Sequence, residues 1–186
     1  MKMLRITMAG NLSGTDSDYP KVTMETSRQT RMTVAWPWIG TAARLGLAAV
    51  WLIAGALKVG DLAASARAVN AYQVMSYDTA KVVGAVQPFL EIALGLLLLI
   101  GLSTRLTAVI SALLLAVFVA GIASAWARGL RIDCGCFSSG GELGRGESTA
   151  YGVDIARDLA FLALSGLLVW RPRTRFSLDG VLLGEK

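Results

Sequence analysis

The 186-residue chain has two cysteines, Cys134 and Cys136, and a single glycine separates them. They lie within Asp133-Cys134-Gly135-Cys136-Phe137, in the only long polar connection between two strongly apolar segments. Because Gly135 can adopt turn conformations that other residues avoid, the two sulfurs can come within disulfide range. A bond across so small a ring would be strained and would exchange readily, whereas a stabilising crosslink closes a longer loop. The spacing therefore favours a redox couple of Cys134 and Cys136 over a structural disulfide.

Other interpretations of the cysteine pair stay open. Each cysteine could bond to a different protein, or both could be inert thiols at an interface. If they are reactive, Arg128 and Arg131 could lower a thiol pKa, while Asp133 would oppose them. A metal site is disfavoured, because the chain has no histidine and the two cysteines with Asp133 supply at most three ligands. The lack of histidine also excludes nucleophiles activated by His.

The composition is that of a membrane protein. Hydrophobic residues make up 54% of the chain, charged residues 17%, and the mean hydropathy is +0.56. Soluble domains carry about 25% charged residues. The net charge of +5 does not indicate nucleic-acid binding, because no basic face with interleaved aromatic residues is present. The basic residues instead flank apolar runs, as cytoplasmic Lys and Arg do in membrane proteins.

Four segments are apolar enough to cross a bilayer, which takes about 20 residues. They cover residues 36–59, 82–102, 106–126 and 151–170. The short turn after Gly101 makes the second and third spans antiparallel neighbours. The sequence therefore predicts an all-α, integral membrane four-helix bundle over residues 36–170. Small residues at helix contacts allow close packing, and the candidates are Gly46, Ala54, Gly55, Gly84, Gly95 and Gly121.

The connecting segments and tails complete the predicted topology. Apolar residues between Gly60 and Lys81 recur at roughly helical spacing, which predicts a short interfacial helix in the first outer loop. Lys58 stands at the end of the first span, where interfacial anchors belong. Residues 1–35 have no apolar run typical of a signal peptide and are predicted to be a disordered cytoplasmic tail. Residues 171–186 form a second cytoplasmic tail.

The distribution of Lys and Arg predicts the orientation. Ten of these residues fall on the side of the two termini and six on the side of the cysteine loop. This excess places both termini in the cytoplasm. Cys134 and Cys136 then face the outer compartment, where disulfides form and persist.

Several ionisable residues fall within the predicted spans. Glu91 lies near the middle of the second span, and a buried carboxylate at such depth needs a partner. Arg44 in the first span and Arg157 in the fourth are the basic candidates. Asp154, Arg157 and Asp158 share one helix face, about one turn below the cysteine loop. Arg157 and Asp158 are therefore predicted to handle protons or thiolates, whereas Glu91 and Arg44 are more consistent with a structural salt-bridge network.

Two sets of residues resemble known families. The first set resembles the DoxX-like four-helix membrane superfamily. It consists of Arg44-Leu45-Gly46, Ala54-Gly55-Ala56-Leu57-Lys58, Pro88, Glu91, Gly95 and Gly101. Within it, the Cys-Gly-Cys-Phe stretch followed by Arg157-Asp158 resembles the methylamine utilisation protein MauE branch. The resemblance runs from about Arg44 to Trp170. Ser138 and Ser139 stand where that branch commonly continues with glycine, which is a departure in the local turn.

The resemblance implies a multi-pass protein of the bacterial inner membrane that supports disulfide formation or maturation of exported proteins. It also implies a thioredoxin-like or exported client protein as partner. It does not imply a role in methylamine metabolism.

Three function classes follow from the residues and the resemblance together. The leading hypothesis is a membrane thiol–disulfide redox protein, in which Cys134 and Cys136 exchange with a partner disulfide through a mixed disulfide. A quinone could accept the electrons, although the sequence carries no evident cofactor motif. The alternative is a non-catalytic accessory subunit of a larger membrane enzyme complex. A small-solute transporter is weaker, because only Pro88 beside Glu91 suggests a broken helix and no inverted repeat is visible.

Overall fold

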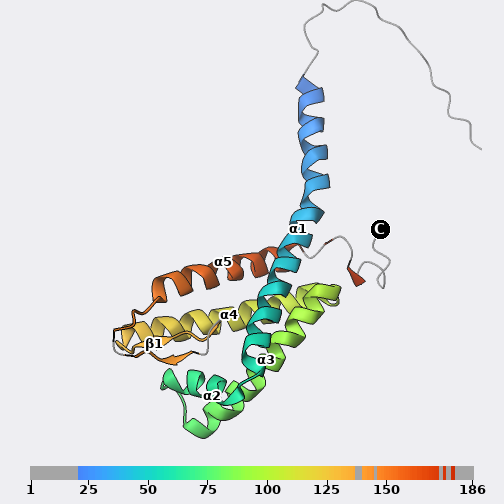
Figure 1. Ribbon diagram of the computed structural model, residues 1–186. Coiled ribbons are helices and arrows are strands. Elements are labelled where there is room, and N and C mark those ends of the chain that lie inside the picture. The colour runs from blue at the N-terminus through green and yellow to red at the C-terminus, as the bar shows by residue number, and fades with distance from the viewer. Residues whose placement is uncertain (1–20, 137–139, 145, 172–173, 175–176, 179–186) are drawn as a thin grey trace, which may run out of the picture. The chain divides into compact units, whose positions relative to one another are not determined.

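A computed structural model of the chain describes residues 21–136, 140–144, 146–171, 174 and 177–178, with side chains from Trp36 onward. Residues 36–186 form one compact unit, separate from residues 1–35. The helices are α1 (Lys21–Val59), α2 (Leu62–Ala71), α3 (Tyr77–Ile100), α4 (Thr104–Ala127) and α5 (Tyr151–Trp170) (Figure 1). Of the predicted tails, residues 1–20 and 179–186 lie outside the described residues, whereas residues 21–35, predicted to be disordered, are helical as the first part of α1.

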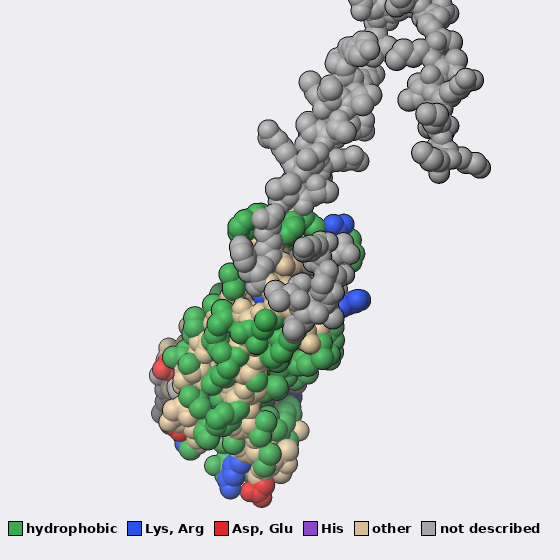
Figure 2. Space-filling view, turned by 90° about the vertical axis from the view of Figure 1, so that its right-hand side faces the viewer, with side chains coloured by type: hydrophobic (Ala, Val, Ile, Leu, Met, Phe, Trp, Pro, Cys, Tyr) green, Lys and Arg blue, Asp and Glu red, His purple; other side chains and the backbone are tan. Residues whose placement is uncertain are grey.

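Three of the described helices are long and apolar enough to cross a membrane. They cover Trp36–Val59, Tyr77–Ile100 and Thr104–Ala127. The acidic and basic residues in the first half of α5 set that helix apart from these three. Figure 2 shows a broad hydrophobic surface, with charged side chains gathered toward its ends. The chain is therefore a membrane protein, and the crossing of α5 stays a prediction.

Local capping sets the helix ends around the first connection. The Ser76 side chain accepts a hydrogen bond from the Thr79 backbone N–H, so α3 begins at Tyr77 rather than at the predicted residue 82. Asp61 caps α2 in the same way through the Ala64 N–H. The helix predicted between residues 60 and 81 is present, and its position at a membrane interface stays a prediction.

Helices α1 and α2 pack one after the other along α3 at glycine contacts. A Cβ added to Gly84 would lie 2.6 Å from the Ala66 Cα of α2. A Cβ added to Gly55 of α1 would likewise collide with α3, and one added to Gly95 of α3 would collide with α1. These three glycines therefore allow the close approach that their size predicts. Gly46 makes no such contact within the described part of the chain, where nothing lies within 4 Å of an added Cβ.

Glu91 pairs with Lys58, and this corrects the expectation of Arg44 or Arg157. The Lys58 ammonium lies 2.7 and 2.9 Å from the two carboxylate oxygens of Glu91. The two side chains are 7% and 1% exposed, so the pair is buried. Because α2 occupies the first turns of α3, the end of α1 lies opposite the middle of α3. Lys58 is consequently a buried partner and not the interfacial anchor that its place in the sequence suggests.

Arg44 lies at the other end of α3. It is 2% exposed, and its guanidinium packs against Gly101, which adopts a φ of +70° to end α3. Between these ends, the Trp51 indole N–H of α1 donates to the Ser111 hydroxyl of α4 over 3.0 Å. Leu47, Leu94, Leu98, Leu115 and Leu168 fill the surrounding core, and α5 packs along α4.

The loop after α4 contains a short hairpin that the sequence does not predict. Strand β1 (Ile132–Asp133) pairs antiparallel with β2 (Gly141–Glu142), and β2 contacts α2. The Tyr151 hydroxyl at the start of α5 accepts the Ile132 N–H and donates to the Leu130 carbonyl. The hairpin thereby holds the cysteine segment between α2 and α5.

Replacing Gly84 with alanine should destabilise the protein. The new methyl group meets helix backbone, and overpacking of this kind costs about 1–3 kcal/mol. Gly46→Ala is the matched control, because it adds the same atom to open space and replaces a helical glycine, for a gain of about 0.5–1 kcal/mol. Thermal unfolding in detergent, followed by circular dichroism, should give a lower Tm for Gly84→Ala alone. Equal Tm values would contradict the described α2–α3 contact.

Replacing Glu91 with glutamine should also destabilise the protein, because it leaves the Lys58 ammonium buried without a counter-charge. Breaking a buried pair in this way costs about 3–5 kcal/mol. The double variant Lys58→Met/Glu91→Leu should recover much of that loss. Asp78→Asn serves as control, since it removes the exposed Lys81–Asp78 pair, which is worth about 0–1 kcal/mol. Thermal unfolding measures all four proteins, and equal losses for both single variants would refute the buried-pair interpretation.

Candidate functional site

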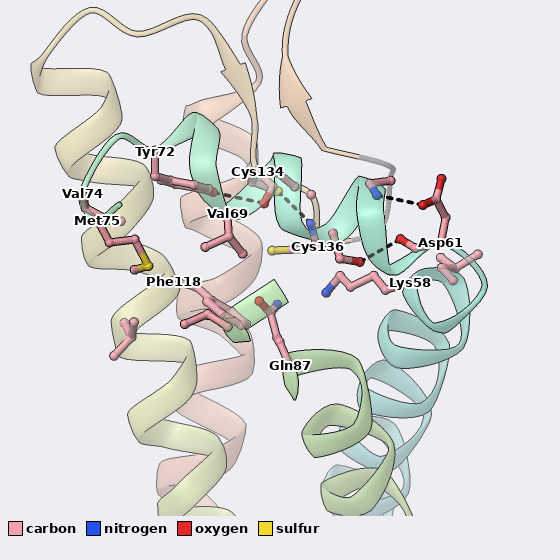
Figure 3. A pocket seen from close by; sticks show the side chains of 18 residues that line it. Lys58, Asp61, Val69, Tyr72, Val74, Met75, Gln87, Phe118, Cys134 and Cys136 are labelled. Carbon is pink, nitrogen blue, oxygen red and sulfur yellow. Dashed lines mark hydrogen bonds between the residues drawn. The ribbon is translucent and has the colours of Figure 1, made fainter. Parts of the chain in front are cut away.

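A cavity of about 350 Å³ lies beside the cysteine segment (Figure 3). Most of its wall is apolar and comes from α1, α2, α3, α4 and the segment between α2 and α3. Both cysteines and Gly135 form part of the wall, together with the polar side chains Lys58 and Gln87. The predicted redox couple therefore borders an apolar cavity at the α2 end of the helices.

Backbone contacts hold the cysteine segment in place. Gly135 adopts a φ of +71°, the turn conformation for which glycine is suited. Asp133 stabilises this turn, because its carboxylate accepts the Gly135 N–H over 3.1 Å. The Tyr72 hydroxyl donates to the Cys134 carbonyl over 3.0 Å. Burial raises the pKa of Tyr72, so the phenol stays a neutral donor.

Several hydrogen-bond donors converge on the Cys134 sulfur. The Cys136 backbone N–H lies 3.5 Å from it, and an Arg157 Nη2 also lies 3.5 Å away. Both cysteines are free thiols, and the Cys136 thiol donates to Cys134. This thiol hydrogen bond, with the Cys136 N–H and Arg157, outweighs burial and lowers the pKa of Cys134 to about 7. The thiolate of Cys134 is therefore more accessible near neutral pH than that of an ordinary cysteine.

Cys136 has the opposite electrostatic character. Its hydrogen bond to Cys134 and its burial raise its pKa, and the negative charges of Cys134 and Asp158 act in the same direction. The Lys58 ammonium acts in the other direction and is weaker. Cys134 is thus the sulfur that ionises first, while Cys136 keeps its proton.

The α5 residues that the sequence singles out do meet the cysteine segment. Asp154 and Asp158 form ion pairs with the Arg157 guanidinium, at nitrogen–oxygen distances of 3.0 and 3.1 Å. Asp158 is 2% exposed, so its carboxylate is a fixed support for the guanidinium. The two carboxylates aim Arg157 at the Cys134 sulfur, and the expected polar group under the loop is present.

The structure places the other candidate residues away from the thiols. Arg128 donates to the backbone carbonyls of Tyr72 and Gln73, and Arg131 donates to that of Glu147, so neither is the cation that contacts a thiol. Sequence reasoning assigned no site role to Lys58 or Tyr72. Their only sequence signals are a basic residue at a helix end and a tyrosine near a predicted headgroup boundary. Arg44 and Glu91 do not contact the cysteines in the described structure: Arg44 lies at the far end of α3, and Glu91 reaches the cavity only through Lys58 and Gln87.

Apolar helices of membrane-spanning length and a thiol pair at one end define the class: a helical membrane protein with a dithiol segment. The family model of the methylamine utilisation protein MauE matches residues 36–171, and the chain belongs to this family. The match takes in both cysteines and the Arg157-Asp158 pair of α5. Neither the curated proteins nor the solved structures include a significant match.

Alkylation of Cys134 should depend on pH with a midpoint near 7. Below that value the sulfur is protonated and the rate falls, and above it the thiolate predominates and the rate levels off. Arg157→Gln should move the midpoint to higher pH, because it removes a donor to the thiolate. Iodoacetamide labelling of the reduced protein, resolved by peptide mass spectrometry, measures the alkylation rate of Cys134 in the wild type and in the variant. The Cys136 peptide should label slowly over the same range.

Arg67→Gln is the matched control for this experiment. Arg67 pairs with Asp61 on the exposed face of α2, where both side chains are 62% exposed. The substitution should leave the midpoint for Cys134 unchanged. A shift of the same size in both variants would mean that general charge, rather than the Arg157–Cys134 contact, controls the thiol pKa.

Proposed function

We propose that this MauE-family protein exchanges disulfides with exported proteins at the outer face of the bacterial inner membrane. Cys134 and Cys136 are the redox couple, and the partner is an exported client or a thioredoxin-like protein. The observation that carries the proposal is the convergence of Arg157, the Cys136 N–H and the Cys136 thiol on the Cys134 sulfur. Such contacts stabilise a thiolate, the form that reacts in exchange.

In the direction of client oxidation, a client thiolate attacks the Cys134 sulfur of the Cys134–Cys136 disulfide. The Cys136 sulfur leaves and takes up a proton, and a mixed disulfide joins Cys134 to the client. The second client thiolate then attacks the client sulfur of that bond, which forms the client disulfide. Cys134 leaves as a thiolate, and a leaving group with a low pKa departs readily. Two client thiols are oxidised and the cysteine pair is reduced.

The membrane arrangement of this proposal has α5 as a fourth span in a four-helix bundle and α2 at the outer interface. Helix α5 has 20 residues, the length that a bilayer requires, and it packs along α4. The bias of Lys and Arg toward the side of the termini supports a cytoplasmic position for both of them. The cysteine segment then faces the compartment in which disulfides persist.

A non-catalytic accessory subunit of a larger membrane complex is the second candidate. The family match and the three span-length helices are compatible with it, since neither requires redox chemistry. Large apolar side chains such as Val82, Phe89 and Leu106 are 64%, 54% and 61% exposed. They could pack against helices of partner subunits as well as against lipid.

The test is to trap the mixed disulfide in intact cells. Cys136→Ser should accumulate a disulfide between Cys134 and its partner, because the Cys134 thiolate can still attack a partner disulfide, and in this reverse direction Cys136 is the thiol that would release the partner. Cys134→Ser should accumulate far less. Non-reducing electrophoresis after a thiol-blocking quench measures the adducts, and mass spectrometry identifies the partner.

Labelling with a membrane-impermeant maleimide tests the topology in the same cells. The wild-type pair should react only after mild reduction from outside. Client maturation that persists in Cys134→Ser/Cys136→Ser would refute the exchange proposal and favour the accessory subunit.

A further inference from the structure

We propose that the cavity beside Cys134 and Cys136 binds the ring of a membrane quinone, which reoxidises the reduced cysteine pair. This inference rests on the proposed exchange function, since a pair that oxidises clients must pass on two electrons after each cycle. The quinone supplies the acceptor. The cysteine pair gives up two electrons and its protons and forms the Cys134–Cys136 bond. The quinone takes up two electrons and two protons to become the quinol, and where Cys134 is already a thiolate one of these protons comes from solvent.

The size and lining of the cavity suit this ligand. A volume of about 350 Å³ falls in the range of small-molecule sites, which are mostly apolar with a few placed polar groups. Val69, Val83 and Phe118 line it with hydrocarbon and an aromatic ring. The thiols lie in the same wall, so a ring held there would contact the sulfurs directly (Figure 3).

Polar groups of the cavity can address the carbonyl oxygens of a quinone. Lys58 is 8% exposed, and its ammonium has three N–H donors, of which the contacts to Glu91 use two. The third can donate to a ligand oxygen. Gln87 also lines the cavity, and one of its amide N–H groups donates to Glu91 over 2.8 Å, which orients the amide. The Lys58–Glu91–Gln87 cluster could also supply a proton to the quinol oxygen.

The cavity wall also reaches the exposed apolar surface of the long helices. Leu57 of α1 and Val117 of α4 both line it, and they are 58% and 64% exposed. Both residues belong to helices of membrane-spanning length. A quinone with an isoprenoid tail could therefore keep its tail in the bilayer while its ring enters the cavity. A water-soluble acceptor would have no need of this apolar wall.

Binding is tested separately from redox chemistry. Full-length Cys134→Ser/Cys136→Ser protein in detergent is titrated with decylubiquinone, and saturable binding is expected although no thiol is present. Val117→Trp in this background fills the cavity from its exposed side and should weaken binding about tenfold. Leu113→Trp is the matched control, because Leu113 lies on α4, is also 64% exposed and does not line the cavity. Equal binding by both tryptophan variants would overturn the site.

The ligand class is tested with decylbenzene, which has the same tail and a ring without carbonyl oxygens. It should bind far more weakly than decylubiquinone. Equal affinity would mean that the cavity takes any apolar chain, including a lipid tail, and would overturn the quinone assignment.

The electron transfer is tested with reduced wild-type protein. Decylubiquinone should oxidise the pair and yield one quinol per disulfide, and Val117→Trp should slow this step while Leu113→Trp should not. If the quinone fails to oxidise the cysteine pair while trapping of the client is intact, this inference is overturned and the exchange function stands. Loss of client trapping would instead strike the exchange function itself.

Discussion

The buried ion pair between Lys58 and Glu91 marks the point on which the site depends. Two charges removed from water need close mutual contact, so the end of α1 is held against the middle of α3. The first turns of α3 are thereby left for α2, which packs at Gly84. Helix α2 in turn leads to Tyr72, the donor to the Cys134 carbonyl. A charge pair in the helix core therefore determines where the cysteine segment is supported.

The two cysteines differ because their surroundings differ. Arg157, itself fixed by two carboxylates, reaches the Cys134 sulfur from α5. Lys58 acts on Cys136 more weakly, and it is already engaged with Glu91. The hydrogen-bond donors that contact Cys134 and the burial of Cys136 together place the negative charge on the Cys134 sulfur. A symmetric pair in water would show no such order.

Sequence patterns predicted the features that lie within one segment better than the contacts between distant segments. The bounds of α5, the helix after Gly60, and Arg157 beneath the cysteine loop all follow from periodicity and spacing within one segment. The predicted partner of Glu91 was wrong, because the true partner depends on how far α2 displaces α1 along α3. The sequence of a single segment does not contain that information. Strands of two residues, such as Ile132–Asp133, are too short to leave a pattern. Gly46 resembles the packing glycines in type alone, because among the described residues nothing lies within 4 Å of a Cβ added to it.

The unequal ionisation of the sulfurs has a consequence for proton balance. With a pKa of about 7 at Cys134 and a raised pKa at Cys136, the reduced pair holds two protons in acid and one above neutrality. Oxidation then releases two protons below pH 7 and one above it. The reduction potential of a two-electron couple should accordingly fall by about 60 mV per pH unit in acid and about 30 mV above neutrality. The compartment's acidity would thus set how strongly the pair oxidises its partners.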